Sequence, residues 1–354
     1  MLDEALGAVN ICRYQTPHQD QDAAEFKDGA MIKPRHQSSG PYRTGVVMDP
    51  IAGIKTYKDS TFAMLLEAQR RGHEIWYMEP TQLTVSDGVA LGHMRPLEVR
   101  DNRDDWFTLG DSENRELAVL DFLLMRKDPP FDMEYVYTTY VLGRAEQAGA
   151  LIVNRPQALR DMNEKAFISW FPECAPQTLI TRSMPDMKAF LEEHGKIAVK
   201  PLEGMGGKSV FVVAAGDKNA NVIFETLTDS GRQFAMAQLF IPEISAGDKR
   251  ILLIDGEPVP YSLARIPSAD DHRGNLVMGA TGEGRELTER ERWICSQVGP
   301  ALRDNGVIFA GIDVIGDFLT EINVTSPTGI RELDRLFDLN IAGTLFDAID
   351  ARLG

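Results

Sequence analysis

The chain has 354 residues, of which 43% are hydrophobic and 25% are charged, a composition typical of a globular protein with two or three domains. Its formal net charge of −16 argues against a nucleic-acid partner, because binding to phosphate backbones needs basic surfaces. No stretch reaches the roughly twenty apolar residues of a membrane span. The three cysteines, Cys12, Cys174 and Cys295, lie far apart and indicate neither a disulfide framework nor a zinc site. We therefore expect a cytoplasmic protein with no membrane partner.

Residues 1–43 are polar and poor in apolar anchors, which predicts a loose extension. Ordered structure is expected from Thr44, where TGVVMDPI is typical of a buried strand. Asp59 can cap the following helix, which we expect to end at Gly72, and HEIWYME then predicts a second strand. This βαβ order favours a parallel sheet.

The next segments continue the same pattern. Residues 84–118 predict short strands and loops, and VLDFLLMR predicts a strand that ends at Arg126. A helix over Asp132–Gln147 and the strand LIVNRP follow. Asn163 is placed to cap a helix that carries Lys165.

A glycine-rich stretch, Ile197–Val213, organises the second half of the chain. It predicts a strand that ends near Lys200, a loop with Gly204, Gly206 and Gly207, and a returning strand. Clustered glycines expose backbone N–H groups to an anion, and lysine adds positive charge, so the pattern indicates a phosphate-binding loop. The alternative interpretation is a flexible hairpin tip.

Two familiar phosphate motifs do not fit this stretch. A P-loop needs glycine where Leu202 stands, and it opens a helix, whereas this loop returns into the strand FVV. A dinucleotide-binding fingerprint also needs a strand, a loop and a helix, so it fails for the same reason. What remains is a hairpin that folds over a nucleotide as a flap.

The segments around and after this stretch predict a small α+β unit and then a larger sheet. LITRS and VIFETLT are expected as strands, with a helix over Met184–His194 between them, and FAMAQLFI is strand-like. DKRILLIDGEPVPYSLARI predicts two strands, and Ile266–Gly284 predicts a long polar loop that is mobile without ligand. A helix from Glu289 to about Asn305, the strand pair GVIFAGIDVIG and FLTEINV, and a helix over Asn340–Leu353 complete the chain.

Asp313, Glu321 and Asn323 lie in this last strand pair and are candidate metal ligands. Carboxylate and amide oxygens suit Mg²⁺, and the period of two places Glu321 and Asn323 on one strand face. The alternative is that they are solvated residues of an edge hairpin.

The turn of this hairpin decides whether one metal can be shared. A two-residue turn at Gly316-Asp317 in a regular ladder pairs Asp313 with Thr320 and sends Glu321 to the other face. We therefore predict a three-residue loop, or an equivalent bulge, that pairs Asp313 with Glu321.

Four arginines, Arg126, Arg250, Arg265 and Arg273, stand at the ends of predicted strands or in the long loop. A guanidinium offers a rigid fork to carboxylate or phosphate, so the set indicates polyanionic substrates. Each taken singly can also be explained as a surface ion pair.

A series of longer motifs now makes a resemblance visible. From about Thr44 to the C-terminus the chain resembles the prokaryotic glutathione synthetase family of ATP-grasp carboxylate–amine ligases. The motifs that carry the resemblance are MDPI, KDSTFAMLLEAQRRG, LMRKDPPFD, NRPQALRDMNEK, KPLEGMGG, GDKRILLIDGEPVPY, LARIP, RGN, GIDVIGD and LTEINVTSPTGIRE.

The resemblance implies a mixed α/β and α+β protein, with an ATP-grasp fold preceded by a parallel-sheet βαβ domain. It places the N-terminal domain at 44–163 and the ATP-grasp domain at 164–350, with 164–237 as a lid subdomain and 238–354 as a C-terminal subdomain. The implied reaction joins γ-glutamylcysteine and glycine to form glutathione. ATP first phosphorylates the cysteinyl carboxylate, and glycine then displaces phosphate from the acyl phosphate.

The resemblance also implies roles for named residues. ATP would be bound by Lys165, Lys200, Gly204, Gly206, Gly207, Gln238, Leu239, Phe240, Ile241 and Asp248. Mg²⁺ or Mn²⁺ would be held by Asp313, Glu321 and Asn323. Arg126 would bind the acid substrate, and Arg250, Arg265, Arg273 and Asn275 would hold substrate carboxylates and the transferring phosphoryl group.

The family further implies a homo-oligomer, a tetramer. Two other functions remain open from the sequence: an ATP-grasp ligase for a different acid or amine, and an ATP-binding regulatory module without catalysis. The second would be expected to lack part of the metal set, whereas all three of its residues are present.

Overall fold

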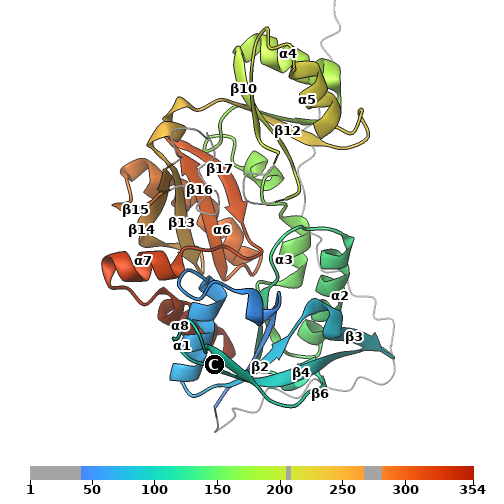
Figure 1. Ribbon diagram of the computed structural model, residues 1–354, viewed down its shortest axis with the longest axis vertical. Coiled ribbons are helices and arrows are strands. Elements are labelled where there is room, and N and C mark those ends of the chain that lie inside the picture. The colour runs from blue at the N-terminus through green and yellow to red at the C-terminus, as the bar shows by residue number, and fades with distance from the viewer. Residues whose placement is uncertain (1–40, 205–208, 267–280) are drawn as a thin grey trace, which may run out of the picture. The chain divides into compact units, whose positions relative to one another are not determined.

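The computed structural model describes residues 41–204, 209–266 and 281–354. The predictions for the rest of the chain lie outside these residues: the extension up to residue 40, the loop segment 267–280, Gly206, Gly207, Arg273 and Asn275. The described chain forms three sheets with helices packed on them (Figure 1).

The first sheet confirms the predicted βαβ unit. Its strand order is β3-β4-β2-β1-β7-β8, with β2, β1, β7 and β8 parallel and β5 and β6 paired to β4. Asp59 caps α1 as predicted, because its carboxylate accepts a hydrogen bond from Phe62 N at 2.7 Å. The strands are β1 (Arg43–Met48), β2 (Glu74–Met78), β3 (Leu83–Ser86), β4 (Val89–Val99), β5 (Phe107–Leu109), β6 (Glu113–Glu116), β7 (Phe122–Arg126) and β8 (Leu151–Val153).

Helices and short 3₁₀ turns connect these strands. The helices are α1 (Ser60–Arg70), α2 (Met133–Gln147) and α3 (Pro156–Asp161), and the 3₁₀ turns are η1 (Ile51–Gly53), η2 (Pro80–Gln82), η3 (Leu117–Val119) and η4 (Ala166–Trp170). Asn163 accepts hydrogen bonds from Lys165 N and Ala166 N, but the helix here is the 3₁₀ turn η4, which begins at Ala166 with Lys165 as its cap residue, so Asn163 stabilises the turn before this helix and is not its N-cap.

The second sheet has the order β11-β10-β12-β9 and is antiparallel. Its elements are β9 (Thr178–Thr181), α4 (Met184–His194), β10 (Lys196–Pro201), β11 (Phe211–Ala214), α5 (Ala220–Leu227) and β12 (Ala235–Leu239). Both helices pack on one face of it, with Leu191 and Phe224 against Ile197 and Val199 (Figure 1).

The expected strand VIFETLT is wrong, since these residues lie in α5 and the turn after it. The buried positions Ala220, Phe224 and Leu227 follow the period of a helix, which the short apolar run concealed. The whole of β12 lies in this sheet, where it pairs with β10 and β9.

The third sheet is antiparallel, with the order β15-β14-β13-β16-β17. Thr281–Glu286 forms β15 beside β14, so the last residues of the loop predicted up to Gly284 are in fact a strand. The remaining elements are η5 (Pro242–Ala246), β13 (Asp248–Ile254), β14 (Glu257–Ile266), α6 (Glu289–Asp304), β16 (Phe309–Ile315), β17 (Phe318–Asn323), α7 (Ile330–Phe337) and α8 (Ile341–Leu353).

Alternation along the strands separates the two faces of this sheet. Ile251, Ile312 and Ile322 share a core cluster with residues of α6, whereas Leu252 and Phe309 share another with residues of α7 and α8. Successive side chains along a strand point to opposite faces of a sheet. The polar residues next to Ile251, Ile312 and Ile322 in these strands therefore lie on the face away from α6.

The last helix packs against the first. Arg71, at the end of α1, binds Asp347 and Asp350 of α8 at 2.7 and 2.8 Å. Phe346 of α8 meets Phe122 of β7 edge to face, with ring centroids 5.6 Å apart. None of the helices in the described part of the chain has the length and apolar character needed to cross a bilayer.

Candidate active site

The hairpin of β16 and β17 brings two carboxylates together. Gly316 and Asp317 form the tight turn, with Ile315 opposite Phe318, so the three-residue loop is wrong. The register then shifts at Thr320, and Asp313 pairs with Glu321, so the bulge that we predicted as the alternative is confirmed.

The bulge residue is fixed by its own side chain. Thr320 is buried, and its hydroxyl donates to the carbonyl of Asp313 at 3.1 Å. Asn323 lies opposite Gly311 on the same face as Glu321, and its Nδ2 is 3.3 Å from Asp313 Oδ2. Ile322 and Val324 face the core, as expected.

Asp313 is buried between two arginines. Arg250 Nη2 donates to Asp313 Oδ2 at 2.8 Å, and Nε reaches the other oxygen at 2.5 Å, whereas Arg265 Nη2 approaches Oδ2 at 2.9 Å. Burial alone would raise the pKa of Asp313, but the two guanidinium groups outweigh it and hold the pKa below its ordinary value. Asp313 is therefore a permanent anion at neutral pH.

Asp248 completes what we call the acid–arginine cluster, which consists of Asp248, Arg250, Arg265 and Asp313. Arg265 binds Asp248 Oδ2 at 2.5 Å, while Asp248 Oδ1 and Arg265 Nε are buried without a hydrogen-bond partner among the described residues. Burial raises the pKa of Asp248, which Arg265 opposes and nearby Asp313 reinforces. Buried polar atoms left unpaired are costly, so this cluster has capacity for a further polar ligand.

Two lysines approach the other carboxylate. Lys165 Nζ and Lys200 Nζ each lie 3.9 Å from Glu321 Oε1. Lys165 also donates to the carbonyl of Gly204 at 2.8 Å, and Lys200 to that of Thr320 at 3.4 Å. Burial lowers the pKa of Lys200, and Glu321 opposes that shift. A buried pair of cations beside one carboxylate is suited to holding a polyanion.

The face of the second sheet that carries Lys200 is opposite its helices. Ile197 and Val199 face α4 and α5, so Ala198 and Lys200 face away from them. Gln238 pairs with Ala198 and is buried, with its Nε2 3.1 Å from Thr178 Oγ1.

The predicted adenine segment continues from this strand. Leu239 N donates to Gln177 O at 2.9 Å, and Phe240 N donates to Lys196 O at 3.2 Å. The Lys196 ammonium stands 3.9 Å from the centroid of the Phe240 ring, and Ile241 is buried.

Arg126 is buried, and its guanidinium group donates hydrogen bonds to two different segments of the chain. Its Nε donates to Thr61 Oγ1 at 3.0 Å, and its Nη2 donates to the carbonyl of Pro327 at 2.9 Å. Arg250 Nη1 reaches the next carbonyl, of Thr328, at 3.5 Å. One short segment after β17 therefore links Arg126 to the acid–arginine cluster. Burial lowers the pKa of Arg126, and Asp128 opposes that shift.

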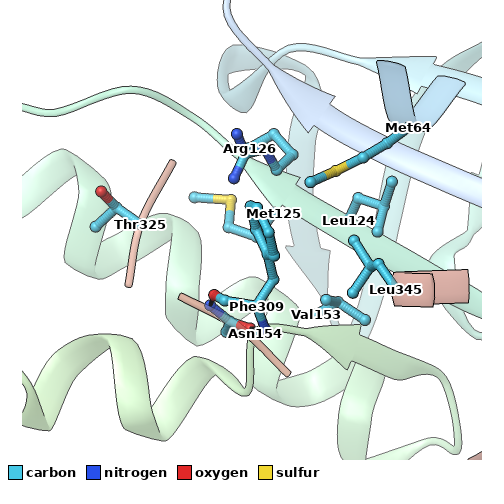
Figure 2. Close-up of a pocket in the computed structure, with 9 residues that line it drawn as sticks. All are labelled: Met64, Leu124, Met125, Arg126, Val153, Asn154, Phe309, Thr325 and Leu345. Atoms are coloured by element: carbon cyan, nitrogen blue, oxygen red, sulfur yellow. Dashed lines mark hydrogen bonds between the residues drawn. The ribbon is translucent and has the colours of Figure 1, made fainter. Parts of the chain in front are cut away.

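A small cavity lies beside Arg126. Figure 2 shows Arg126 and Thr325 on one side of it, with Met64 and Leu345 on another. Its volume is about 10 Å³, which admits no more than about one water molecule. A cavity of this volume is too small for a substrate.

Two side chains that the sequence did not single out support the site, the half-buried Glu164 and the buried Asn154. Glu164 Oε1 accepts hydrogen bonds from Val324 N at 3.0 Å and from Thr325 N and Oγ1 at 3.0 and 2.7 Å. It thereby ties the backbone next to Lys165 to the end of β17. Asn154 likewise bridges two strands, since it donates to the carbonyls of Phe309 and Val324, both at 2.7 Å.

The predicted metal ligands have the chemistry of a divalent cation site. Asp313 and Glu321 lie directly opposite one another on neighbouring strands, Asn323 lies two residues along from Glu321, and their two carboxylates and one amide offer the hard oxygen atoms that Mg²⁺ and Mn²⁺ prefer. No group of three or more His, Cys, Asp or Glu side chains able to hold a metal occurs among residues 41–204, 209–266 and 281–354. A metal site with three protein ligands at this position therefore needs the amide oxygen of Asn323 in addition to the two carboxylates.

Two domain models of one protein family match successive parts of the chain. Residues 42–160 match the model of the prokaryotic glutathione synthetase N-terminal domain, and residues 164–338 match that of the ATP-grasp domain of the same family. Among solved structures, D-cycloserine synthetase DcsG is similar, with a TM-score of 0.62 at 14% identity over 88% of this chain and 100% of that one. A RimK domain ATP-grasp protein from Sphaerobacter thermophilus has a TM-score of 0.56 at 16% identity, covering 86% and 98% of the two chains. These likenesses show the ATP-grasp fold.

Sequence relatives are much closer. A glutathione synthetase of Xanthomonas axonopodis pv. citri is 58% identical over 306 residues, which cover 86% of this chain and 97% of the relative. The glutathione synthetase of Coxiella burnetii is 54% identical over 310 residues, covering 88% and 97%, and that of Escherichia coli O157:H7 is 56% identical over 311 residues, covering 88% and 99%. With both domain models matched in order, the chain belongs to the prokaryotic glutathione synthetase family of ATP-grasp ligases.

Proposed function

We propose that the protein joins γ-glutamylcysteine and glycine to form glutathione, with ATP converted to ADP and phosphate. The observation that carries the proposal is the arrangement around the Asp313–Glu321 pair. Two lysines approach Glu321 and two arginines enclose Asp313, so cations surround a carboxylate pair suited to a metal. Phosphoryl transfer depends mainly on such positioning and charge neutralisation.

We assign ATP to the region of the lysines. Lys165 and Lys200 would bind its phosphates, and the loop of Gly204, Gly206 and Gly207 would cover them. The adenine would be held by Gln238, Leu239, Phe240 and Ile241, and Asp248 would meet the ribose. Two observations support these assignments. Lys200 and Gln238 lie on the same face of the sheet, and Lys165 Nζ donates a hydrogen bond to the carbonyl of Gly204.

Asp313, Glu321 and Asn323 would hold Mg²⁺ or Mn²⁺. When bound, the cation neutralises charge on the ATP phosphates. The chain's own contribution is to keep Asp313 ionised, through Arg250 and Arg265, and to fix the register that turns Glu321 to the same face.

The acid substrate is assigned to the arginines. Arg126 would bind a substrate carboxylate, and Arg250, Arg265, Arg273 and Asn275 would hold the reacting carboxylate and the phosphoryl group. The cysteinyl carboxylate oxygen takes the γ-phosphoryl group, and ADP leaves. The glycine nitrogen then bonds to the acyl carbon, the carbon–oxygen bond to phosphate breaks, and the amine loses a proton.

We further infer a division into 44–163 and 164–350, with 164–237 as the lid subdomain and 238–354 as the C-terminal subdomain. A cytoplasmic location and a homo-oligomeric state, a tetramer, belong to the same proposal. Sedimentation equilibrium of the purified protein measures the oligomeric state directly, and cell fractionation tests the location.

The test of the reaction is phosphate release by the purified protein with ATP, Mg²⁺ and γ-glutamylcysteine, with and without glycine. We expect release that needs both substrates, and glutathione in equal amount to the phosphate. Release that ignores either substrate would overturn the assignment. Release with γ-glutamylcysteine and an amine other than glycine, but not with glycine, would instead identify a different ligase.

A further inference from the structure

The turn of the β16–β17 hairpin is bound by side chains from outside the hairpin. Lys249 Nζ of β13 donates to the carbonyl of Gly316 at 3.3 Å. Arg290 Nε of α6 donates to the next carbonyl, of Asp317, at 3.0 Å. Gly316 has a φ of +56°, and a Cβ placed on it would lie 3.2 Å from Glu243 Cβ, so the turn also packs against η5. The tip of the hairpin is therefore fixed by three neighbouring elements.

A buried acid fixes Lys249. The Lys249 ammonium forms an ion pair with Glu291 Oε1, without the geometry of a hydrogen bond. Glu291 is only 1% exposed, and its other carboxylate oxygen accepts from Thr288 N at 2.9 Å as part of the capping box of α6. The start of α6 therefore holds the lysine that binds the hairpin turn.

Arg290 belongs to the same turn of α6 and is fixed as well. Its Nη2 donates to the carbonyl of Glu173 at 2.8 Å, and its guanidinium stands 4.3 Å over the ring of Trp293. Within the described part of the chain, these contacts go to backbone carbonyls and a ring, and Arg290 forms no ion pair there. We call Lys249, Arg290 and Glu291 the turn clamp.

The turn clamp acts on the strand that carries Glu321. This strand, β17, lies at the edge of the third sheet, where it pairs with β16 alone among the described strands (Figure 1). The register of that pairing shifts next to Asp313. An irregular edge strand is weakly specified, and a slip of one residue would turn Glu321 to the opposite face. Holding the turn fixes where β17 begins, and with it the position of Glu321.

One strand connects the turn clamp to the other carboxylate. Lys249 and Arg250 are successive residues of β13, opposite Val314 and Asp313 of β16. Because successive side chains point to opposite faces, Arg250 binds Asp313 on one side of the sheet while Lys249 meets α6 on the other. Asp313 and the hairpin turn are thus both positioned relative to β13.

We propose that the turn clamp is a positioning device for the metal site, which sets the placement of Glu321 against Asp313 and hence the affinity for a divalent cation. Lys249 and Arg290 are positioning residues, since they bind the turn and not the predicted metal ligands. Ligands that are held in place before the metal arrives bind it more tightly. The inference rests on the metal site of the proposed function, but not on which acid or amine the protein joins.

The first test compares two arginines in the first turn of α6. Arg290→Met removes the donor to the Asp317 carbonyl and leaves the buried ion pair intact. We expect the Kd for Mn²⁺, followed by the electron paramagnetic resonance signal of free Mn²⁺, to rise about tenfold, as for other groups that orient metal ligands. Backbone amides of β17 should exchange with deuterium at least about threefold faster, while those of β12 keep their rates. Arg292→Met, at an exposed position, is the matched control and should change neither measurement.

The second test separates positioning from stability. Lys249→Met leaves Glu291 buried without its partner, so it should lower both the free energy of unfolding and the affinity for Mn²⁺. Adding Glu291→Gln removes the unpaired charge and should restore much of the stability in urea unfolding. The affinity for Mn²⁺ should stay low in this double variant, because the Gly316 carbonyl still lacks its donor.

Three results overturn the proposal. One is an Arg290→Met variant in which either the Kd for Mn²⁺ or the exchange of β17 is unchanged. Another is a double variant whose affinity for Mn²⁺ recovers together with its stability, and the third is a wild-type chain that binds no Mn²⁺. A chain that binds Mn²⁺ as expected but forms no glutathione would instead refute the proposed reaction and leave the role of the turn clamp intact.

Discussion

Asp313 and Glu321 are cross-strand neighbours that are neutralised by different cations. Arginines enclose Asp313, whereas the described cations that form ion pairs with Glu321 are two lysines, each at 3.9 Å, and Glu321 keeps 26% of its side chain exposed. Direct ion pairs with arginine make Asp313 the fixed member of the pair. We infer that Glu321 is the member of the pair that contacts the metal.

Replacing Glu321 with glutamine should therefore abolish metal-dependent turnover while the protein stays folded, since size is kept and charge is lost. We expect a loss of about 100-fold or more in phosphate release at low Mg²⁺. The measurement is phosphate release against Mg²⁺ concentration, with circular dichroism as the check on folding. Asp317→Asn, an exposed carboxylate in the turn of the same hairpin, is the control and should behave as wild type. Full activity of Glu321→Gln at low Mg²⁺ would remove Glu321 from the metal site.

Replacing Lys200 with methionine should weaken the use of ATP far more than the use of glycine. The aliphatic stem stays in the buried strand, and only the ammonium beside Glu321 is lost. We expect the apparent KM for ATP to rise about tenfold or more, as is usual for a charged hydrogen bond of about 1.5–3 kcal/mol. Initial rates with each substrate varied in turn give the comparison. Lys188→Met, on an exposed position of α4, serves as control. An unchanged KM for ATP would contradict the phosphate assignment of Lys200.

Arg126→Lys should act on the acid substrate. A lysine cannot donate to both Thr61 and Pro327 while presenting a fork to a carboxylate. We expect the KM for γ-glutamylcysteine to rise about tenfold or more, with the KM for ATP changed much less. Arg155→Lys, with an exposed side chain, is the matched control. A variant whose two KM values rise equally would show a general disturbance of the fold instead.

Glu67 should make the protein's stability depend on pH. A hydrogen bond from Arg70, supported by Arg71, holds the pKa of Glu67 at about 2, below its ordinary value of 4.5. Because the folded pKa is the lower one, the stabilisation is complete above the ordinary value and is lost as the pH falls toward 2.

Glu67→Gln should therefore lower the free energy of unfolding at neutral pH by about 1–3 kcal/mol, and the difference from wild type should shrink in acid. Urea unfolding at a series of pH values measures this. Glu74→Gln, at an exposed position, should show no such pH-dependent difference. A difference for Glu67→Gln that stays constant down to the acid limit would exclude the ion pair as its cause.

Local patterns in the sequence predicted much of the fold, and long-range contacts explain most of the failures. The βαβ unit around Asp59 follows from a cap and two apolar runs, all of which are local. The run VIFETLT was misread because three adjacent apolar residues, Val222, Ile223 and Phe224, fit a strand as well as one turn of a helix. The helix α7 was not predicted, and its first N–H groups are bonded by Ser60 of the distant α1, at 3.1 and 3.2 Å.

The candidate site shows the same division. The spacing of Asp313, Glu321 and Asn323 predicted that they share one face of the sheet, provided that a bulge shifts the register of the hairpin. The enclosure of Asp313 by Arg250 and Arg265 could not be read from spacing, because it depends on which strands lie beside β16. Glu164 was overlooked for a similar reason, since its partners lie about 160 residues away along the chain.

The packing of α8 on α1 has a consequence for how the chain folds during synthesis. The face of the first sheet that carries Phe122 is covered in part by Phe346 of α8, which is synthesised long after the strands of this sheet. A nascent first sheet therefore exposes apolar surface until α8 emerges, and chains released before that point should be prone to aggregation and proteolysis. Residues 42–160 match a domain model of their own, yet their sheet is covered only once α8 packs on it.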